Sequence, residues 1–140
     1  RSEVRIVTKI TDKWVRESVN TEEAPAAIGP YSQAIAAGPL IFASGQLGIK
    51  PGTKEFVSKE AAGQAKQAME NLASILVEGG SSLDMILKTE IYLSDMKDFK
   101  EVNEVYGSCF DVDPPSRITV EVSDLPMGAK VEISAVALRD

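Results

Sequence analysis

The chain has 140 residues, of which 44% are hydrophobic and 26% are charged, and its formal net charge is −6. This composition is typical of one globular domain, and it excludes a disordered or fibrous segment. The single cysteine excludes an intrachain disulfide, and the absence of histidine excludes His-containing catalytic triads, a histidine general base and His-ligated metals. The acidic balance argues against a broad surface for nucleic acid or anionic lipid.

The first 16 residues carry the opposite charge from the rest of the chain. They hold five basic and two acidic side chains, which leaves −9 for the remainder. Residues 1–14 are predicted to form a basic N-terminal extension, and residues 15–140 a single domain. A solvated extension is the favoured interpretation, while a targeting remnant or an amphipathic arm stays open. Trp14 is expected to pack the extension against the domain.

Residues 24–49 include no charged side chain, a run long enough to span a membrane. Its prolines and glycines break any helix, however. We therefore predict two short buried strands, over residues 32–37 and 40–44, with a tight turn at Gly38 and Pro39 between them.

Two helices and a strand are predicted in the middle of the chain. Apolar residues at three- and four-residue spacing predict a helix over residues 60–79. A β-branched, apolar segment predicts a strand over residues 85–93. A second helical pattern covers residues 99–110 and ends before two consecutive prolines.

Two alternating segments near the C-terminus predict a β-hairpin. Apolar residues occupy every second position in residues 116–122 and 129–138. Pairing Val122 with Ala129 matches the two apolar faces, which we expect the helices to cover. The order of elements predicts an α+β fold in which helices pack on one face of a mixed sheet.

The predicted register gathers polar side chains on the outer face of the hairpin. It places Thr119 opposite Glu132 and Arg117 opposite Ser134, with Glu132 diagonal to Arg117. An arginine fixed on a strand offers a planar set of donors that matches a carboxylate, so these residues indicate a site for a small anion. The competing interpretation is an exposed ion pair between Arg117 and Glu132, which contributes little to stability.

Other polar residues are candidates for the same site, and each has a structural alternative. Gly45, between Ser44 and Gln46 at the end of a buried strand, either lets a ligand approach the backbone or forms a bulge. Tyr31 either lines a pocket or packs in the core or an interface. Asn103, on the second helix, faces either a neighbouring subunit or solvent.

Taken together, these residues resemble the reactive intermediate deaminase family, RidA/YjgF. The resemblance covers roughly residue 15 to the C-terminus, in the order and spacing of the family. The segments that carry it are residues 24–34, 44–46, 102–106, 115–117, 125–126 and 131–133. The resemblance implies a chorismate mutase-like α+β fold with two helices on one face of the sheet. It also implies a homotrimer with ligand sites between subunits.

The family resemblance implies an enzyme that hydrolyses enamine and imine intermediates. Its substrates would be 2-iminobutanoate and 2-iminopropanoate, its products 2-oxo acids and ammonia, and its role the protection of pyridoxal-phosphate enzymes from reactive metabolites. No metal and no organic cofactor are implied. Arg117 matches the arginine that holds the substrate carboxylate, and Glu132 the glutamate associated with the water and proton transfer. The residues that match the lining of the cleft are Tyr31, Ser44, Gly45, Gln46, Asn103 and Thr119.

Two other functions stay open as alternatives. Some relatives are described as translation inhibitors or endoribonucleases, but this acidic chain lacks histidine and has no basic stripe with interleaved aromatic residues. A non-catalytic metabolite-binding or chaperone-like trimer is the second alternative, because a fold does not determine a function. The expected partners are small 2-imino acids and further copies of the chain, without membrane or nucleic acid. The expected location is the cytoplasm, or an organelle if the extension is a targeting remnant.

Overall fold

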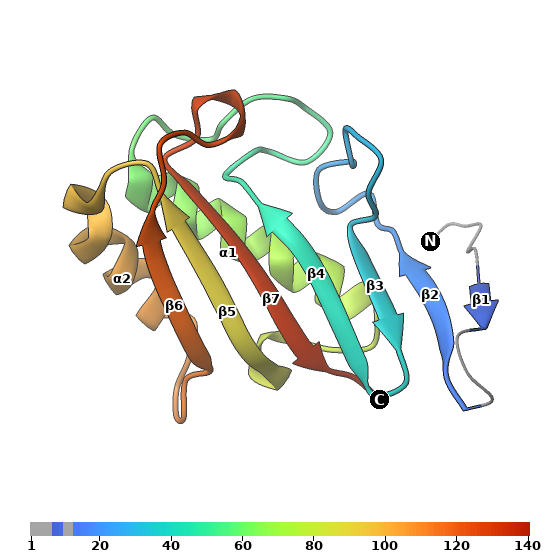
Figure 1. Cartoon of the computed structure of the whole chain (residues 1–140). Coiled ribbons are helices and arrows are strands. Elements are labelled where there is room, and N and C mark those ends of the chain that lie inside the picture. The colour runs from blue at the N-terminus through green and yellow to red at the C-terminus, as the bar shows by residue number, and fades with distance from the viewer. Residues whose placement is uncertain (1–6, 10–12) are drawn as a thin grey trace.

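The computed structural model describes residues 7–9 and 13–140, which form one mixed sheet with helices against one of its faces (Figure 1). The sheet has seven strands in the order β1-β2-β3-β4-β7-β5-β6. The strands are β1 (Val7–Lys9), β2 (Val15–Val19), β3 (Ala34–Ala37), β4 (Leu40–Gln46), β5 (Ile86–Leu93), β6 (Ser116–Glu121) and β7 (Val131–Leu138). The helices are α1 (Ala61–Glu78) and α2 (Phe99–Gly107), with 3-10 turns η1 (Leu83–Met85), η2 (Met96–Asp98) and η3 (Pro126–Gly128).

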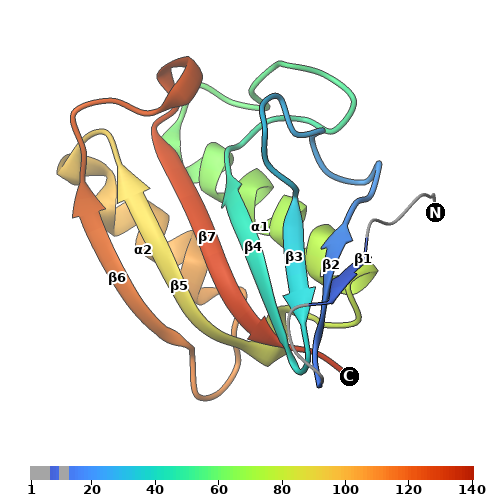
Figure 2. The same cartoon turned by 45° about the vertical axis from the view of Figure 1, so that its right-hand side comes forward.

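Both helices lie on the same side of the sheet. Helix α1 crosses behind β4 and β7, and α2 lies behind β5 and β6 (Figures 1 and 2). The core between α1 and the sheet includes Leu72, Leu76, Ile41 and Ile133, all fully buried. Burying each such side chain contributes about 1.5–3 kcal/mol. The prediction of an α+β fold with two helices on one face of a mixed sheet is confirmed, and the other face stays open within the chain.

The uncharged segment forms strands, as predicted. Strands β3 and β4 pair as an antiparallel hairpin, and Gly38 in the turn has φ +55°, a left-handed conformation that favours glycine. Strand β4 extends two residues beyond its predicted end, to Gln46. No helix among residues 7–9 and 13–140 is long and apolar enough to cross a bilayer.

The predicted hairpin between residues 116–122 and 129–138 is wrong. Both segments contain strands, but β5 lies between them, parallel to β6 and antiparallel to β7. Val122 therefore does not pair with Ala129, and its N–H donates to Leu93 O at 2.8 Å. Helix α2 provides the long connection that parallel neighbours such as β5 and β6 require. Alternation determines which residues of a strand share a face, but it does not determine which strand lies beside it.

The faces of β6 are also reversed relative to the prediction. Arg117 lies opposite Thr89, which is fully buried on the side covered by the helices. Arg117 and Thr119 therefore share the helix side of the sheet. Ile118 and Val120 lie on the open side, where they are 48% and 40% exposed. The apolar set of β6 consequently contributes to an unpartnered surface and not to the core.

Two strands lie in the basic N-terminal region, where no strand is predicted. β1 pairs with β2, and β2 pairs with β3. Trp14 packs against the β3–β4 turn, as predicted. Its indole ring lies so close to Gly38 that a Cβ atom at this glycine would overlap it. Arg139 holds the same corner by donating to Gly38 O at 3.0 Å and to Glu17 Oε1 at 3.1 Å. Residues 1–6 of the extension lie outside the described residues, and the boundary at residue 14 stays a prediction.

A buried amide on α1 holds the loop that follows β4. Asn71 is fully buried, and its Nδ2 donates to Leu47 O at 3.1 Å and to Ile49 O at 3.0 Å. Its Oδ1 accepts from Gln67 Nε2 at 2.8 Å. Buried carbonyl groups need such partners. Helix α1 thereby positions the chain immediately after Gln46.

Asn71→Leu should lower the free energy of unfolding by about 2–5 kcal/mol, because it leaves two buried carbonyl groups without a donor. Chemical denaturation at one fixed protein concentration measures the loss. Gln67→Ala removes a partly buried donor alone and is the matched control, with an expected loss of about 1 kcal/mol or less. Equal stability of the Asn71→Leu variant and the wild type would contradict this role.

Candidate functional site

The predicted site residues lie in two groups at different places on the sheet. The glutamate cluster, at the end of β4 and the beginning of β7, consists of Tyr31, Ser44, Gly45, Gln46 and Glu132. The arginine cluster, on α2 and β6, consists of Asn103, Arg117 and Thr119. The fold thus places the predicted site residues in two separate clusters of one chain, and not in a single cluster.

Arg117 is held by side chains of α2. Its Nη1 donates to Asn103 Oδ1 at 2.6 Å. Its guanidinium carbon lies 5.0 Å from the ring centroid of Tyr106 and 5.7 Å from that of Phe99. Cations at this distance from an aromatic ring are attracted to it. These contacts orient the guanidinium while leaving further N–H donors for a ligand.

The arginine cluster contains no carboxylate that neutralises it. Within the part of the chain that the structure describes, Arg117 forms no ion pair. Thr119, two residues along the same strand, has a buried hydroxyl with no hydrogen-bond partner among those residues. A planar cation and a hydroxyl on one face are suited to a small carboxylate. The predicted ion pair between Arg117 and Glu132 is therefore wrong.

Glu132 lies against the backbone of Gly45. A Cβ atom at Gly45 would overlap the Glu132 carboxylate, so the carboxylate lies close against this backbone. The register of β4 on β7 shifts between Ala43 and Gln46, so Gly45 also lies in a bulge. Partial burial raises the pKa of Glu132 above its ordinary value. The glutamate cluster thus combines a close backbone approach with a carboxylate that holds its proton unusually well.

Polar side chains fasten the loop that carries Tyr31. Gln33 is 2% exposed and exchanges hydrogen bonds with the backbone of residues 21–25. Ser44 Oγ donates to Ser32 O at 2.6 Å. Tyr31 is 50% exposed on this anchored loop, which contradicts its packing in the core of the chain and agrees with a place in a pocket or interface.

The two clusters cannot meet within one chain. Arg117 is on β6 and Glu132 is on β7, and β5 lies between these strands. Two strand spacings separate them by about 9–10 Å. Glu132 lies opposite Tyr92 on the open side of the sheet, whereas Arg117 lies on the helix side. The predicted proximity of Thr119 and Arg117 to Glu132 is therefore wrong.

Two aromatic residues that orient Arg117 are absent from the predicted site. Phe99 and Tyr106 occupy the face of α2 that also presents Asn103, at three- and four-residue spacing. That spacing is visible in the sequence, but it is equally typical of a core-facing helix. The contact with Arg117 follows only from the parallel placement of β6 beside β5.

The anchored Arg117, on the helix side of an α+β sheet, is suited to binding a small anionic group. The family described as Endoribonuclease L-PSP matches residues 21–139. Reactive Intermediate Deaminase A, chloroplastic, from Arabidopsis thaliana is 47% identical over 122 residues, which are 87% of this chain and 65% of that protein. 2-Iminobutanoate/2-iminopropanoate deaminase from Mus musculus is 42% identical over 125 residues, 89% of this chain and 93% of that protein.

The chain belongs to the Endoribonuclease L-PSP family, and the predicted resemblance to reactive intermediate deaminases is confirmed. Other relatives carry the names Protein DfrA and RutC family protein. Among solved structures, E. coli TdcF with bound serine has a TM-score of 0.84 and 38% identity, and the match covers 88% of this chain and 98% of TdcF. The fold is therefore shared with this family across nearly its full length.

Glu132→Gln should raise the melting temperature at pH 8. The raised pKa of Glu132 means that its contribution to stability is complete below the unfolded value, about 4.3, and is lost as the pH rises through the folded value. Glu132→Gln removes the charge and restores that stability at pH 8. The difference in melting temperature between the variant and its parent should therefore vanish below about pH 4. The comparison is with the wild type, in which burial is the cause of the raised pKa of Glu132.

Thermal unfolding of both proteins across this pH range measures the effect. Glu22→Gln, in an exposed loop, is the matched control and should show no such pH-dependent gain. A Glu132→Gln variant that is less stable than its parent at pH 8 would contradict burial as the cause.

Proposed function

We propose that the chain hydrolyses 2-iminobutanoate and 2-iminopropanoate to 2-oxo acids and ammonia, in a site completed by a second copy of the chain. One observation carries this proposal. Arg117 and Glu132, to which the family resemblance assigns the substrate carboxylate and the proton transfer, lie on different strands and opposite faces of one chain. A site that contains both residues therefore requires two copies.

The open face of the sheet supports contact between copies. Phe42 and Ile118 are 47% and 48% exposed there, and Val120 and Leu138 are each 40% exposed. Exposed large apolar side chains on one face are typical of interaction sites. Contact between the β6 edge of one copy and the open face of the next joins two different surfaces, and such contacts close into rings. A ring of three is the number that the family resemblance implies.

Arg117 is proposed to hold the substrate carboxylate. Its guanidinium offers two parallel donors, and Asn103, Tyr106 and Phe99 restrict its orientation. The Thr119 hydroxyl is an additional donor beside it. Across the interface, Tyr31, Ser44, Gly45 and Gln46 would line the same cleft. Holding the carboxylate fixes C2 of the imine relative to the attacking water.

Glu132 is proposed to move the proton. Water adds through its oxygen to C2 of the protonated imine, and Glu132 accepts one proton of that water. Glu132 then returns this proton to the carbinolamine nitrogen. The C2–N bond breaks as the C2=O bond forms, and the hydroxyl proton passes through Glu132 to the departing ammonia, which leaves as ammonium. A protonated imine is already a strong electrophile, so positioning and one modest base are sufficient. The raised pKa of Glu132 suits a group that both accepts and returns a proton.

The relatives support a small-molecule deaminase. Two of them are named for deamination, one of them specifically of 2-iminobutanoate and 2-iminopropanoate. The bound ligand of TdcF is serine, which is a small amino acid with the carboxylate that Arg117 is expected to hold. The family is described as Endoribonuclease L-PSP, but the net charge of −6 and the absence of histidine argue against RNA cleavage by this chain. We place the activity in the cytoplasm, with an organelle as the alternative, since one relative is named chloroplastic.

Arg117→Ala should lower kcat/KM for 2-iminobutanoate at least about 100-fold, because it removes a partly buried, charge-assisted contact to the substrate. The imine is generated by a threonine dehydratase and trapped with semicarbazide, and the assay measures how much the protein diverts to 2-oxobutanoate. Lys100→Ala, which removes an exposed cation from α2, the helix that orients Arg117, is the matched control with unchanged activity. No diversion by wild-type protein of verified trimeric mass would contradict the proposal.

Glu132→Gln separates a deaminase from a non-catalytic binder. A deaminase should keep its affinity for a small 2-oxo acid and lose most of its rate, by about 100-fold or more. Calorimetric titration measures the affinity, and the trapping assay measures the rate. Retention of both binding and wild-type rate would remove Glu132 from the proposed chemistry.

Mixing two inactive variants tests whether the site lies between copies. In equimolar mixed rings of Arg117→Ala and Glu132→Gln subunits, about a quarter of the interfaces would combine an intact arginine with an intact glutamate. Refolding the two variants together should therefore restore about a quarter of wild-type activity. The separately refolded variants, combined afterwards without exchange, are the control. No recovery in verified mixed rings would contradict an intersubunit site.

A further inference from the structure

A hollow on the open face of the sheet is not used by the proposed chemistry. It is bordered by β2, by the β3–β4 hairpin and by the loop that carries Tyr31. Ile35 and Phe42, which lie opposite each other on β3 and β4, form the apolar part of its wall. Tyr31 and Ser44, members of the glutamate cluster, also line it. We call it the hairpin hollow.

Arg16 is the one charged residue that lines the hairpin hollow within the described part of the chain. It lies on β2 opposite Ala37, and it is exposed. Among residues 7–9 and 13–140 it forms no ion pair, and its neighbour Glu17 pairs instead with Arg139. A cation beside exposed apolar side chains is complementary to a segment that combines carboxylates with an apolar residue.

The chain presents such a segment in the turn between α2 and β6. Asp111, Val112 and Asp113 are exposed there, and Val112 is 80% exposed. Neither carboxylate forms an ion pair with another described residue. No basic residue lies between Lys100 and Arg117, so this stretch of sequence includes no compensating cation. We call residues 111–113 the acidic tip.

The backbone gives the acidic tip a defined shape. Asp113 has φ +50°, a left-handed conformation that aspartate tolerates better than most residues. Pro114 and Pro115 follow it, and each proline ring fixes its own φ. A turn restricted in this way loses little conformational entropy when it docks on another surface.

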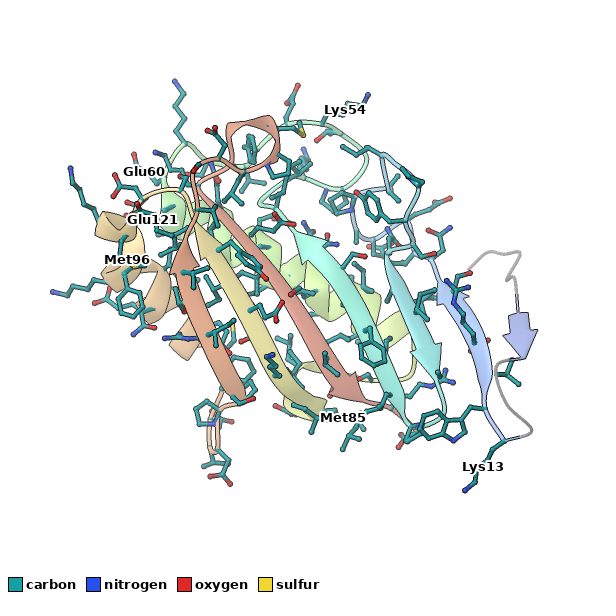
Figure 3. All side chains as sticks on the ribbon, viewed as in Figure 1. Lys13, Lys54, Glu60, Met85, Met96 and Glu121 are labelled. Atoms are coloured by element: carbon teal, nitrogen blue, oxygen red, sulfur yellow. The ribbon has the colours of Figure 1, made fainter. Side chains whose placement is uncertain are left out.

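The acidic tip cannot reach the hairpin hollow of its own chain. Five strand spacings, or about 24 Å, separate β2, which carries Arg16, from β6, which follows the tip. Figure 3 views the open face and shows this separation, with Lys13 beside β2 at one side of the sheet and Glu121 on β6 at the other. An acidic tip that occupies the hollow must therefore come from another copy of the chain.

The proposed function brings the acidic tip of the next copy close to this hollow. It puts the next copy's arginine cluster beside Tyr31 and Ser44, and the tip precedes Arg117 by four to six residues. Such a segment spans at most about 13–22 Å. Arg16 lies about 17 Å from Ser44, because two strand spacings and four residues along the strand separate them. The tip is therefore long enough to reach Arg16.

We propose that the hairpin hollow of one copy binds the acidic tip of the next copy. The two carboxylates of the tip face Arg16, and Val112 packs against Ile35 and Phe42. This inference rests on the proposed function, from which it takes the contact between copies. Complementary charges of this kind favour the correct neighbour and disfavour arrangements that bring like charges together.

A charge-swap experiment tests the contact. Every variant carries Asp113→Asn, which leaves one acidic partner and keeps a residue that tolerates the left-handed conformation. Arg16→Glu and Asp111→Lys each bring like charges together. Each should raise the protein concentration at which half of the copies are assembled at least about tenfold. The combined variant restores opposite charges and should recover most of this loss.

Sedimentation velocity over a dilution series at low ionic strength measures assembly, because salt screens exposed charges. Lys66→Glu makes the same change of charge on the exposed face of α1, on the other side of the sheet, and is the matched control. It should alter the assembly concentration less than about twofold. Val112→Ser should raise that concentration about 3- to 10-fold without any change of charge. Circular dichroism and melting temperature verify that each variant is folded.

The outcomes separate this contact from the proposed function. An assembly concentration that neither Arg16→Glu nor Asp111→Lys changes in folded protein overturns the contact and leaves the active site between copies intact. Two weakened single variants without recovery in the combined variant also overturn it. A wild type that stays monomeric at every concentration overturns both proposals. Assembly without imine hydrolysis overturns the proposed function alone, since sedimentation tests the contact without substrate.

Discussion

The position of β5 between β7 and β6 is the constraint on which the rest of the structure depends. Because β5 and β6 are parallel, the chain needs a long connection between them, and α2 supplies it. The same placement turns Arg117 toward α2 and leaves Ile118 on the open face. This strand order thus creates both an oriented arginine and an exposed apolar surface. It also keeps that arginine away from Glu132 in the same chain.

Separated charges of this kind are informative because burial penalises a charge without a partner. Arg117 is stabilised by an amide oxygen and two aromatic rings, none of which neutralises it. Glu132 responds to burial with a raised pKa. Neither residue is neutralised by the other within the described chain, as the proposed site between two copies requires. An ion pair between these residues within the chain would have removed both the uncompensated charge of Arg117 and the raised pKa of Glu132.

The chain around the glutamate cluster is rigid for identifiable reasons. Gln33 bonds to the loop before Tyr31, and Asn71 bonds to the loop after Gln46. Both amides are buried, so their hydrogen bonds are expensive to break. A site on loops fixed in this way holds a ligand at little entropic cost. The bonds of Asn71 also tie the loop after Gln46 to the packing of α1.

The sequence by itself determined the strands from β3 onward, both helices, the turn at Gly38, and the candidate residues that the family resemblance names, but not β1 and β2. These follow from local periodicity and local motifs, which do not depend on distant contacts. Only the tertiary structure decided that β5 separates the two predicted hairpin strands, that Arg117 lies against Tyr106, and that Arg117 and Glu132 occupy opposite faces. The physical reason is that alternation specifies the faces of a strand, whereas its neighbours are chosen by the packing of the whole sheet against α1 and α2.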